Sequence, residues 1–265
     1  MKFITSAEQA IVKKDFREIW ETKMARSTLL AVPILLVVLL PIIYCVMIYF
    51  IPVNQMNGVD KMLQLLPSEA KGFTVQQSML YLMTNLLCPM FFLMIPLMGS
   101  SVSAACSFVG EKERNTIETL LLTPLSVKQI FKAKVLGCIV LSTISTVISF
   151  VAFSIVISIE DILFKMPFFL NWNWLVLVLF LAPAVTIFGV IFMVIVSAKS
   201  KSYMESFQVS GYVVLPVVLL FVGQFTGLFQ LNAIILLFIS LGVFLIDFVL
   251  LLLGSRIFTS EKLLK

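Results

Sequence analysis

The 265-residue sequence contains no histidine and only four cysteines. Without histidine, the chain lacks the commonest metal ligand and the commonest general base. The cysteines are Cys45, Cys88, Cys106 and Cys138. They have no paired spacing and fall inside or at one end of long apolar stretches, so we interpret them as small core residues rather than as metal or redox sites.

Motifs that mark enzymes and nucleotide-binding proteins are missing as well. The sequence has no G-x-S-x-G, no H-E-x-x-H and no intramembrane aspartate pair, which argues against catalysis in a membrane. It also has no P-loop of the form G-x-x-x-x-G-K-[ST], and the run Gly110-Glu111-Lys112 does not replace one. We therefore predict that the chain is not an enzyme and holds no metal or cofactor. A nucleotide that drives such a chain would have to bind to another polypeptide.

Charge is scarce, and apolar residues are abundant. Charged residues make up 12% of the chain and hydrophobic residues 60%, and the mean hydropathy is +1.09; soluble domains carry about a quarter charged residues. About 20 residues at 1.5 Å rise cross a hydrocarbon core of about 30 Å, so long apolar stretches predict spanning helices. We find six such stretches, at 28–51, 79–109, 127–159, 174–196, 207–223 and 231–253. They are too long and too uniformly apolar for barrel strands, which predicts an all-α integral membrane protein with six transmembrane helices.

Lysine and arginine are distributed unevenly between the two sides that six spans define. Of the 19 basic residues, only Lys61, Lys71 and Lys165 lie in connections on the side opposite the termini. Because basic residues in short loops stay cytoplasmic, we expect both termini to face the cytoplasm and the chain to lie in the plasma membrane. This bias accounts for the net charge of +5, so we predict no nucleic-acid partner. A cleavable signal peptide is not expected, because the first apolar stretch is long enough to span and no A-x-A site follows it.

The sequence shows no sign of a boundary between domains. The sequence shows no internal repeat and no low-complexity linker. We therefore predict a single transmembrane domain over residues 1–265. It comprises a cytoplasmic helix in 1–27, a six-span bundle in 28–253 and a cytoplasmic tail in 254–265.

The segment before the first span has helical periodicity. Val12, Phe16, Ile19 and Trp20 recur at helical spacing, while charged residues fill the other faces. This pattern predicts an amphipathic helix that lies along the inner membrane surface, with its basic residues near anionic lipid. The alternative is a short soluble helix that leads into the first span.

One polar segment separates the second and third apolar stretches: GEKERNTIETLLLTPLSVKQIFKAK. Asn115 is a good N-cap, and Glu118 three residues later fits a capping box, which predicts a short helix over 116–122. Thr123 precedes Pro124 and is pushed out of helical geometry, so we expect this helix to stop there. The result is a two-turn helix between two long ones.

The helices on both sides of this segment are predicted to leave the membrane. Ser126 and Gln129 form a second capping box, which begins the helix of the third span. A continuous helix over 79–109 would be about 46 Å long, against a core of about 30 Å. A cytoplasmic protein could therefore reach the short helix between them. The alternative is an ordinary inner loop whose charges extend to the lipid headgroups.

The run from Gly110 to Ser126, with Ile130 and Lys134, resembles the signature of permease subunits of type-2 ABC transporters. In that family a charged run leads to a Thr, an acidic residue, leucines and the pair Thr-Pro, and a Lys follows at the start of the third span. The six spans, the N-terminal amphipathic helix and the basic tail FTSEKLLK are similar too, so the resemblance extends over the whole chain. The connection over 52–78 departs from the pattern, because it is too short for the outer domain of the sodium-exporter-like members.

The resemblance implies a subunit whose cytoplasmic coupling helix docks in a groove of a separate ABC ATPase, which binds the ATP. It also implies a second permease subunit, identical or different. The positions that match the family motif are Glu111, Glu113 and Arg114 at the inner end of the second span, and Thr116, Glu118, Thr119, Thr123 and Pro124 in or beside the coupling helix.

Few polar groups lie within the predicted spans. Asp247 is the only acidic residue well inside one, and its two interpretations are pairing with an inner Lys or Arg and a role in ion passage. Asn85 is a further candidate for the transport path. The run from Gly99 to Ser107 is rich in small residues, which predicts close packing against a helix of this chain or of a second subunit. Kinks are predicted at Pro33, Pro41, Pro89, Pro96, Pro183 and Pro216.

The leading functional hypothesis is the permease subunit of an ATP-driven ABC exporter. A secondary transporter or channel not driven by ATP is the alternative, but it would need more intramembrane polar groups or an inverted repeat. A membrane enzyme comes last, because the motifs named above are missing. The sequence does not indicate the cargo: peptide antibiotics, lipid-linked molecules, drugs and sodium all fit.

Overall fold

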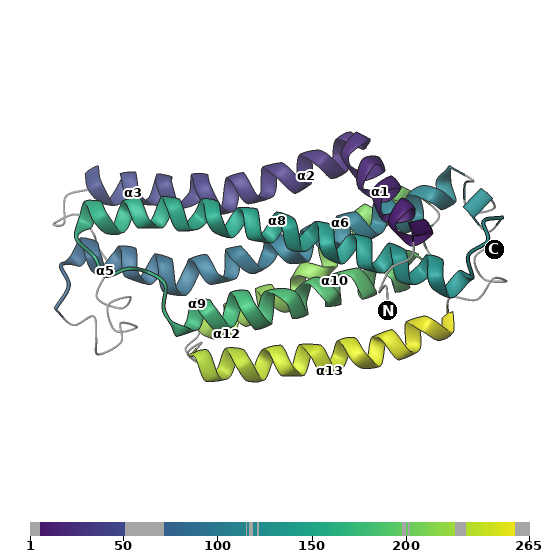
Figure 1. The fold of residues 1–265 in the computed structure, drawn as a ribbon. Helices are drawn as coiled ribbons and strands as arrows, with labels where there is room; N and C mark the ends of the chain where they lie inside the picture. Colours follow the sequence, from purple (N-terminus) through teal and green to yellow (C-terminus); the bar gives the residue numbers. More distant parts are fainter. Residues whose placement is uncertain are drawn as a thin grey trace.

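The computed structural model describes residues 6–50, 72–114, 116, 119–120, 122–197, 200, 202–225 and 232–257. Every regular element in these ranges is a helix, and the helices lie side by side in one elongated bundle (Figure 1). Six stretches of the described chain are long and apolar enough to span a membrane: Lys23–Phe50, Val75–Glu113, Val127–Phe164, Trp172–Ser197, Met204–Gln224 and Ala233–Leu252. We number them spans one to six. The predicted fold class, an all-α membrane protein with six spans, is confirmed.

Four of the spans consist of several helical elements. Span one contains α2 (Lys23–Pro33), η1 (Ile34–Leu39) and α3 (Leu40–Phe50), and span two contains α5 (Val75–Leu82), η4 (Met83–Leu87) and α6 (Cys88–Glu113). Span four contains α9 (Trp172–Val176), η5 (Leu177–Leu181) and α10 (Ala182–Ser197), and span five contains α11 (Tyr203–Ser210), η6 (Gly211–Val214) and α12 (Leu215–Phe225). Spans three and six are single helices, α8 (Val127–Phe164) and α13 (Ala233–Ile257). A separate helix, α1 (Ser6–Glu21), precedes span one.

The interruptions of the α-helices coincide with prolines. The segments η1, η4 and η5 are π-helical and η6 is 3₁₀-helical; each ends two residues before a proline, at Pro41, Pro89, Pro183 and Pro216 respectively. Proline has no N–H and its ring clashes with the carbonyl group four residues earlier, and in all four cases that carbonyl belongs to the irregular segment. Pro96, in contrast, lies within α6, which stays α-helical around it. Four of the six predicted proline sites therefore show a local departure from α-helical geometry.

Span two is the central helix of the bundle. Of its apolar stretch, 67% is buried, whereas spans one and six bury only 17% of theirs. Its longest element, α6, packs between α8 of span three and α10 of span four (Figure 1). The apolar stretch of span two is therefore the most buried of the six.

Small residues bring α6 close to both of these neighbours. A Cβ atom added at Gly99 would lie 3.2 Å from the Ser142 Oγ of α8. A Cβ atom added at Gly189 of α10 would collide with the Ser100 Oγ and would lie 3.1 Å from the Leu97 carbonyl oxygen. The predicted close packing of the small-residue run is confirmed, and the partner helices belong to this chain.

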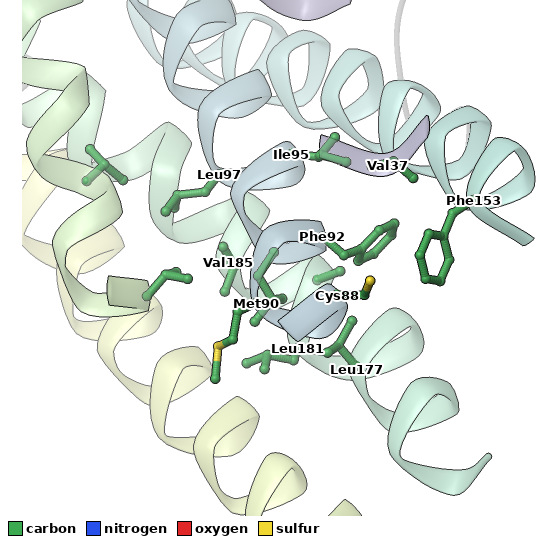
Figure 2. Close-up of a cluster of buried hydrophobic side chains, with 14 of the residues drawn as sticks. Val37, Cys88, Met90, Phe92, Ile95, Leu97, Phe153, Leu177, Leu181 and Val185 are labelled. Carbon is green, nitrogen blue, oxygen red and sulfur yellow. The ribbon is translucent and has the colours of Figure 1, made fainter. Parts of the chain in front are cut away.

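An aromatic cluster packs the other end of the same core. The ring centroid of Trp174 lies 4.7 Å from that of Phe153 and 5.8 Å from that of Phe92. Figure 2 shows Phe92 and Phe153 beside Cys88 and Leu177, so residues of α6, α8 and η5 meet here. Three of the four cysteines are buried and the fourth is half-buried, all as free thiols, which agrees with their interpretation as core residues.

The two ends of the bundle are formed by different helix ends and connections. The helix α1, the connection between α6 and α8, and the carboxyl end of α13 lie at one end (Figure 1). The ends of α3 and α8 lie at the opposite end, as six crossings require. Which end faces the cytoplasm stays a prediction.

The start of α8 agrees with the sequence in detail. The Ser126 Oγ accepts a hydrogen bond from the Gln129 N–H at 3.3 Å, and the Gln129 Oε1 accepts one from the Ser126 N–H at 2.9 Å. This capping box is therefore confirmed. The helix then runs unbroken over 38 residues.

The predicted short helix is described only in part. Residues 119–120 are helical, and Thr123 and Pro124 lie outside the helix, as the restriction on residues before proline requires. Asn115 and Glu118 lie outside the described residues. Their capping box stays a prediction.

Candidate functional site

Charged side chains of three helices meet at the end of the bundle that carries the connection between α6 and α8. They are Lys14, Asp15 and Glu18 of α1, Glu111 and Arg114 at the end of α6, and Lys134 of α8. Together with Ser107 of α6, we call these residues the charge network.

Lys134 lies at the centre of the charge network. Its side chain is only 3% exposed, and its Nζ lies 3.1 Å from the Glu111 Oε2 and 3.3 Å from the Asp15 Oδ2. The ammonium group also donates to the carbonyl oxygen of Ser107 at 2.8 Å and to its Oγ at 3.2 Å. The Ser107 hydroxyl in turn donates to the Asp15 Oδ2 at 2.6 Å. One buried ammonium group therefore holds carboxylates of α1 and α6 at the same time.

Two further ion pairs extend the network toward solvent. The Glu111 Oε1 accepts from the Lys14 Nζ at 2.7 Å, so the two carboxylate oxygens of Glu111 contact different helices. The Arg114 Nη1 donates to the Glu18 Oε1 at 2.9 Å. The Lys14 and Arg114 side chains are close to half exposed, and water screens these pairs more than it screens the buried ones.

The sequence of α1 places Asp15 against the bundle. Ile11, Asp15 and Ile19 follow one another at four-residue intervals, so they lie on one face of the helix, and all three are buried. Phe16 and Trp20, which belong to the predicted apolar face, are 48% and 46% exposed. The helix therefore has one stripe buried against the protein and a half-exposed aromatic stripe beside it. Its position at the membrane surface stays a prediction.

Burial dominates the electrostatics of Asp15. It raises the pKa of this carboxyl group above its ordinary value, and the Lys134 ammonium group and the Ser107 hydroxyl only partly oppose the rise. For Lys14, burial lowers the pKa, but the hydrogen bond and ion pair with Glu111 outweigh this effect and leave the pKa raised. The buried pair of Asp15 and Lys134 is therefore interdependent, because removing either partner leaves an unpaired charge in the interior.

The carboxylates of the network are also spaced as metal ligands would be. Oxygens of Asp15, Glu18 and Glu111 lie within 4.8 Å of one another. Each of these carboxylates already pairs with a basic side chain, so the site has its counter-charges without a cation. We therefore interpret it as an ion-pair network that joins helices.

The structure brings two of the predicted coupling residues, Glu111 and Arg114, into the network. Thr116 lies beside them, because its N–H donates to the Glu111 carbonyl oxygen at 3.0 Å. Glu113, Thr119, Thr123 and Pro124 are exposed, as is Arg114 itself. Glu118 lies outside the described residues. The role of all of these residues in contacting an ATPase stays a prediction.

Sequence analysis missed four of the seven residues of the network. The missed residues are Lys14, Asp15, Glu18 and Ser107, and Lys134 was noted only as part of the family resemblance. A local signal was present, because Asp15 stands in an apolar stripe four residues from Ile11 and from Ile19. Its partners could not be found from spacing, since Ser107 is 92 residues away and Lys134 is 119 residues away.

The two intramembrane candidates have different surroundings. The Asn85 Oδ1 accepts from the Asn171 Nδ2 at 2.6 Å, and its Nδ2 donates to the Tyr81 carbonyl oxygen at 3.1 Å, so this side chain links spans two and four. Asp247 is 2% exposed, and neither of its carboxylate oxygens has a hydrogen-bond partner within the described part of the chain. Both interpretations of Asp247 therefore stay predictions.

Comparison with known proteins adds one finding. Residues 9–241 match the family model described as ABC-2 family transporter protein. This range includes the whole charge network and most of the six spans. No curated protein and no solved structure matches the chain.

Proposed function

We propose that this chain, which belongs to the ABC-2 family of transporter proteins, is the permease subunit of an ATP-driven exporter. The family and the six apolar helices make it a multi-pass membrane component of a transporter. In the proposal, a separate ABC ATPase binds and hydrolyses the ATP. It acts on the connection between α6 and α8.

The observation that carries the proposal is the position of the charge network. The helix α6 ends at Glu113 and α8 begins at Val127, so the predicted coupling helix belongs to the segment that connects them. Immediately beside this connection, Glu111 and Lys134 join the same two helices and attach α1 to both. A force on the connection would therefore reach three helices together instead of bending one loop. A coupling element has to transmit motion in this way.

The lengths of the two helices support contact with a cytoplasmic partner. Span two has 39 residues and span three has 38, so each is about 57 Å long as a helix. A hydrocarbon core of about 30 Å leaves a large part of each helix outside it. The connection would therefore stand well clear of the lipid.

In the proposed mechanism two permease subunits, identical or different, surround the transport path in the plasma membrane. Both termini and the connection face the cytoplasm, as the distribution of Lys and Arg predicts. ATP-driven closure of two ATPases pushes on the coupling helices and changes the path from inward-open to outward-open.

Co-purification from the native cell tests this function. We expect a tagged chain to carry an ABC ATPase with it, in a complex that holds two permease subunits, and we expect no ATP turnover by the isolated chain. Cross-linking gives a positional test in a background without native cysteines: Thr119→Cys should cross-link to the ATPase, and Phe168→Cys, exposed at the opposite end, should not. ATP turnover by the isolated chain, free of contaminating ATPase, would refute the proposal.

A further inference from the structure

An apolar groove opens on the outer surface of the bundle between α1, span one and α8. Its volume is about 450 Å³, and apart from two serine hydroxyls its walls are apolar. Phe16 and Trp20 form an aromatic wall, with their rings stacked 6.5 Å apart. The other large exposed side chains in the walls are Leu30, Ile34, Ile144 and Ile148.

The length of the groove matches one leaflet of a bilayer. Along α8 its lining extends from Leu141 to Ala152, which is about 16 Å at 1.5 Å per residue. Along span one it extends from Leu29 to Val38, which is about 14 Å. Half of a hydrocarbon core is about 15 Å. The groove therefore begins at α1 and extends over about the thickness of one leaflet.

The end of the groove at α1 is positively charged. Lys13 stands three residues before Phe16, and Arg17 stands three residues before Trp20, so each basic side chain neighbours an aromatic one on the helix surface. Both basic residues are exposed. Glu21 pairs with Arg17 and offsets its charge, so Lys13 supplies the net positive charge at this edge.

The volume of the groove is that of a small-molecule site. Such sites have volumes of about 300 to 1,000 Å³, and the 450 Å³ of the groove lies within this range.

We infer that this groove binds one anionic phospholipid of the leaflet that borders α1. An acyl chain lies between the aromatic wall and the Ile144 and Ile148 side chains, and the headgroup phosphate lies against Lys13 and Arg17. The apolar lining, its one-leaflet length and its basic end together specify this ligand. The lipid would fill the space between α1 and the spans, and so would help to hold α1 in place.

Fluorescence quenching by brominated lipids tests the site. The full chain is placed in nanodiscs of unlabelled phosphatidylcholine. In one series an increasing fraction of this lipid is replaced by dibrominated phosphatidylglycerol, and in the other by dibrominated phosphatidylcholine. The signal of Trp20 is the difference between the wild type and Trp20→Phe, a substitution that keeps an aromatic wall. Each basic residue near a membrane surface contributes about fivefold to the affinity for anionic lipid. Half-maximal quenching of Trp20 should therefore need a several-fold lower fraction of brominated phosphatidylglycerol than of brominated phosphatidylcholine.

Two sets of variants separate charge from shape. The double variant Lys13→Gln/Arg17→Gln, at exposed positions, should make the quenching of Trp20 by the two lipids nearly equal. Ser145→Leu fills the groove and should reduce quenching by both lipids. Thr143→Leu, exposed on the same helix outside the groove, is its matched control and should leave quenching unchanged. The melting temperature of each variant shows that it is folded.

Either of two results overturns the inference. Equal quenching of Trp20 by both lipids in the wild type would mean that the basic end recognises no headgroup. Absence of quenching by either lipid would mean that protein, such as a second copy of the chain, covers the groove. Both results are independent of ATP turnover and of binding to an ATPase.

Discussion

Replacing Lys134 by methionine tests the charge network most directly. Methionine keeps the length and apolar stem of the side chain and removes the ammonium group. Asp15 then loses its buried cation, and Glu111 keeps only the half-exposed Lys14. Breaking a buried ion pair costs about 3 to 5 kcal/mol, because a charge is left uncompensated in the interior. We expect Lys134→Met to lower the free energy of unfolding by an amount in this range.

Arg17→Met provides the matched control, since it also replaces a paired cation by methionine. The Arg17 and Glu21 side chains are 82% and 63% exposed, and exposed pairs contribute about 0 to 1 kcal/mol. The predicted order of destabilisation is therefore Lys134→Met well above Arg17→Met. Chemical unfolding of the purified chain in one detergent measures the difference under identical conditions.

A rescue variant identifies the cause of the loss. Asp15→Asn removes the carboxylate that Lys134→Met leaves unpaired, so the double variant should be less destabilised than the sum of the two single variants. Coupling between residues in one network is about 0.5 to 3 kcal/mol. If Lys134→Met is no more destabilising than Arg17→Met, or if the two losses simply add, the network does not hold the three helices together.

Three further predictions follow from individual positions. Glu118→Gln should keep normal membrane levels but weaken ATPase association by about 1 to 3 kcal/mol, and Glu118→Arg should weaken it more; wild-type export by Glu118→Arg would exclude a docking role. Gly189→Ala should lower stability by about 1 to 3 kcal/mol, because its Cβ would collide with the Ser100 Oγ, whereas Gly242→Ala has no atom within 4 Å to meet and should not; equal melting temperatures would contradict this packing. Glu113→Cys, in a background without native cysteines, should resist impermeant thiol reagents in intact cells and react after permeabilisation; labelling from outside would invert the topology.

Much of the fold was predictable because its signals are local in the sequence. Spanning helices depend on the hydropathy of about 20 consecutive residues, and all six predicted spans are present in the structure. The capping box of Ser126 and Gln129 depends on two residues three positions apart, and it forms as predicted. The small residues around Gly99 indicated close packing, although they did not identify the helices that pack there.

The candidate site was predictable only in part. Motif resemblance pointed to Glu111 and Arg114, which lie in the charge network, but it gave no reason why they lie there. Glu111 contacts Lys14 through one carboxylate oxygen and Lys134 through the other. No spacing along the sequence brings residues of three separate helices to one carboxylate. The ATPase-binding positions stay predictions, since a binding partner determines whether they act.

The sequence by itself determined the class of the molecule, its six spans and the polar segment between the second and third, because these depend on composition and short-range order. Only the tertiary structure decided which face of α1 packs on the bundle. The sequence pattern grouped Ile19 with Phe16 and Trp20, but packing buries Ile19 beside Asp15 and leaves the two aromatic rings about half exposed. The physical reason is that a charged residue can occupy an apolar stripe when the fold supplies its counter-charge. Here Lys134, 119 residues away, supplies it.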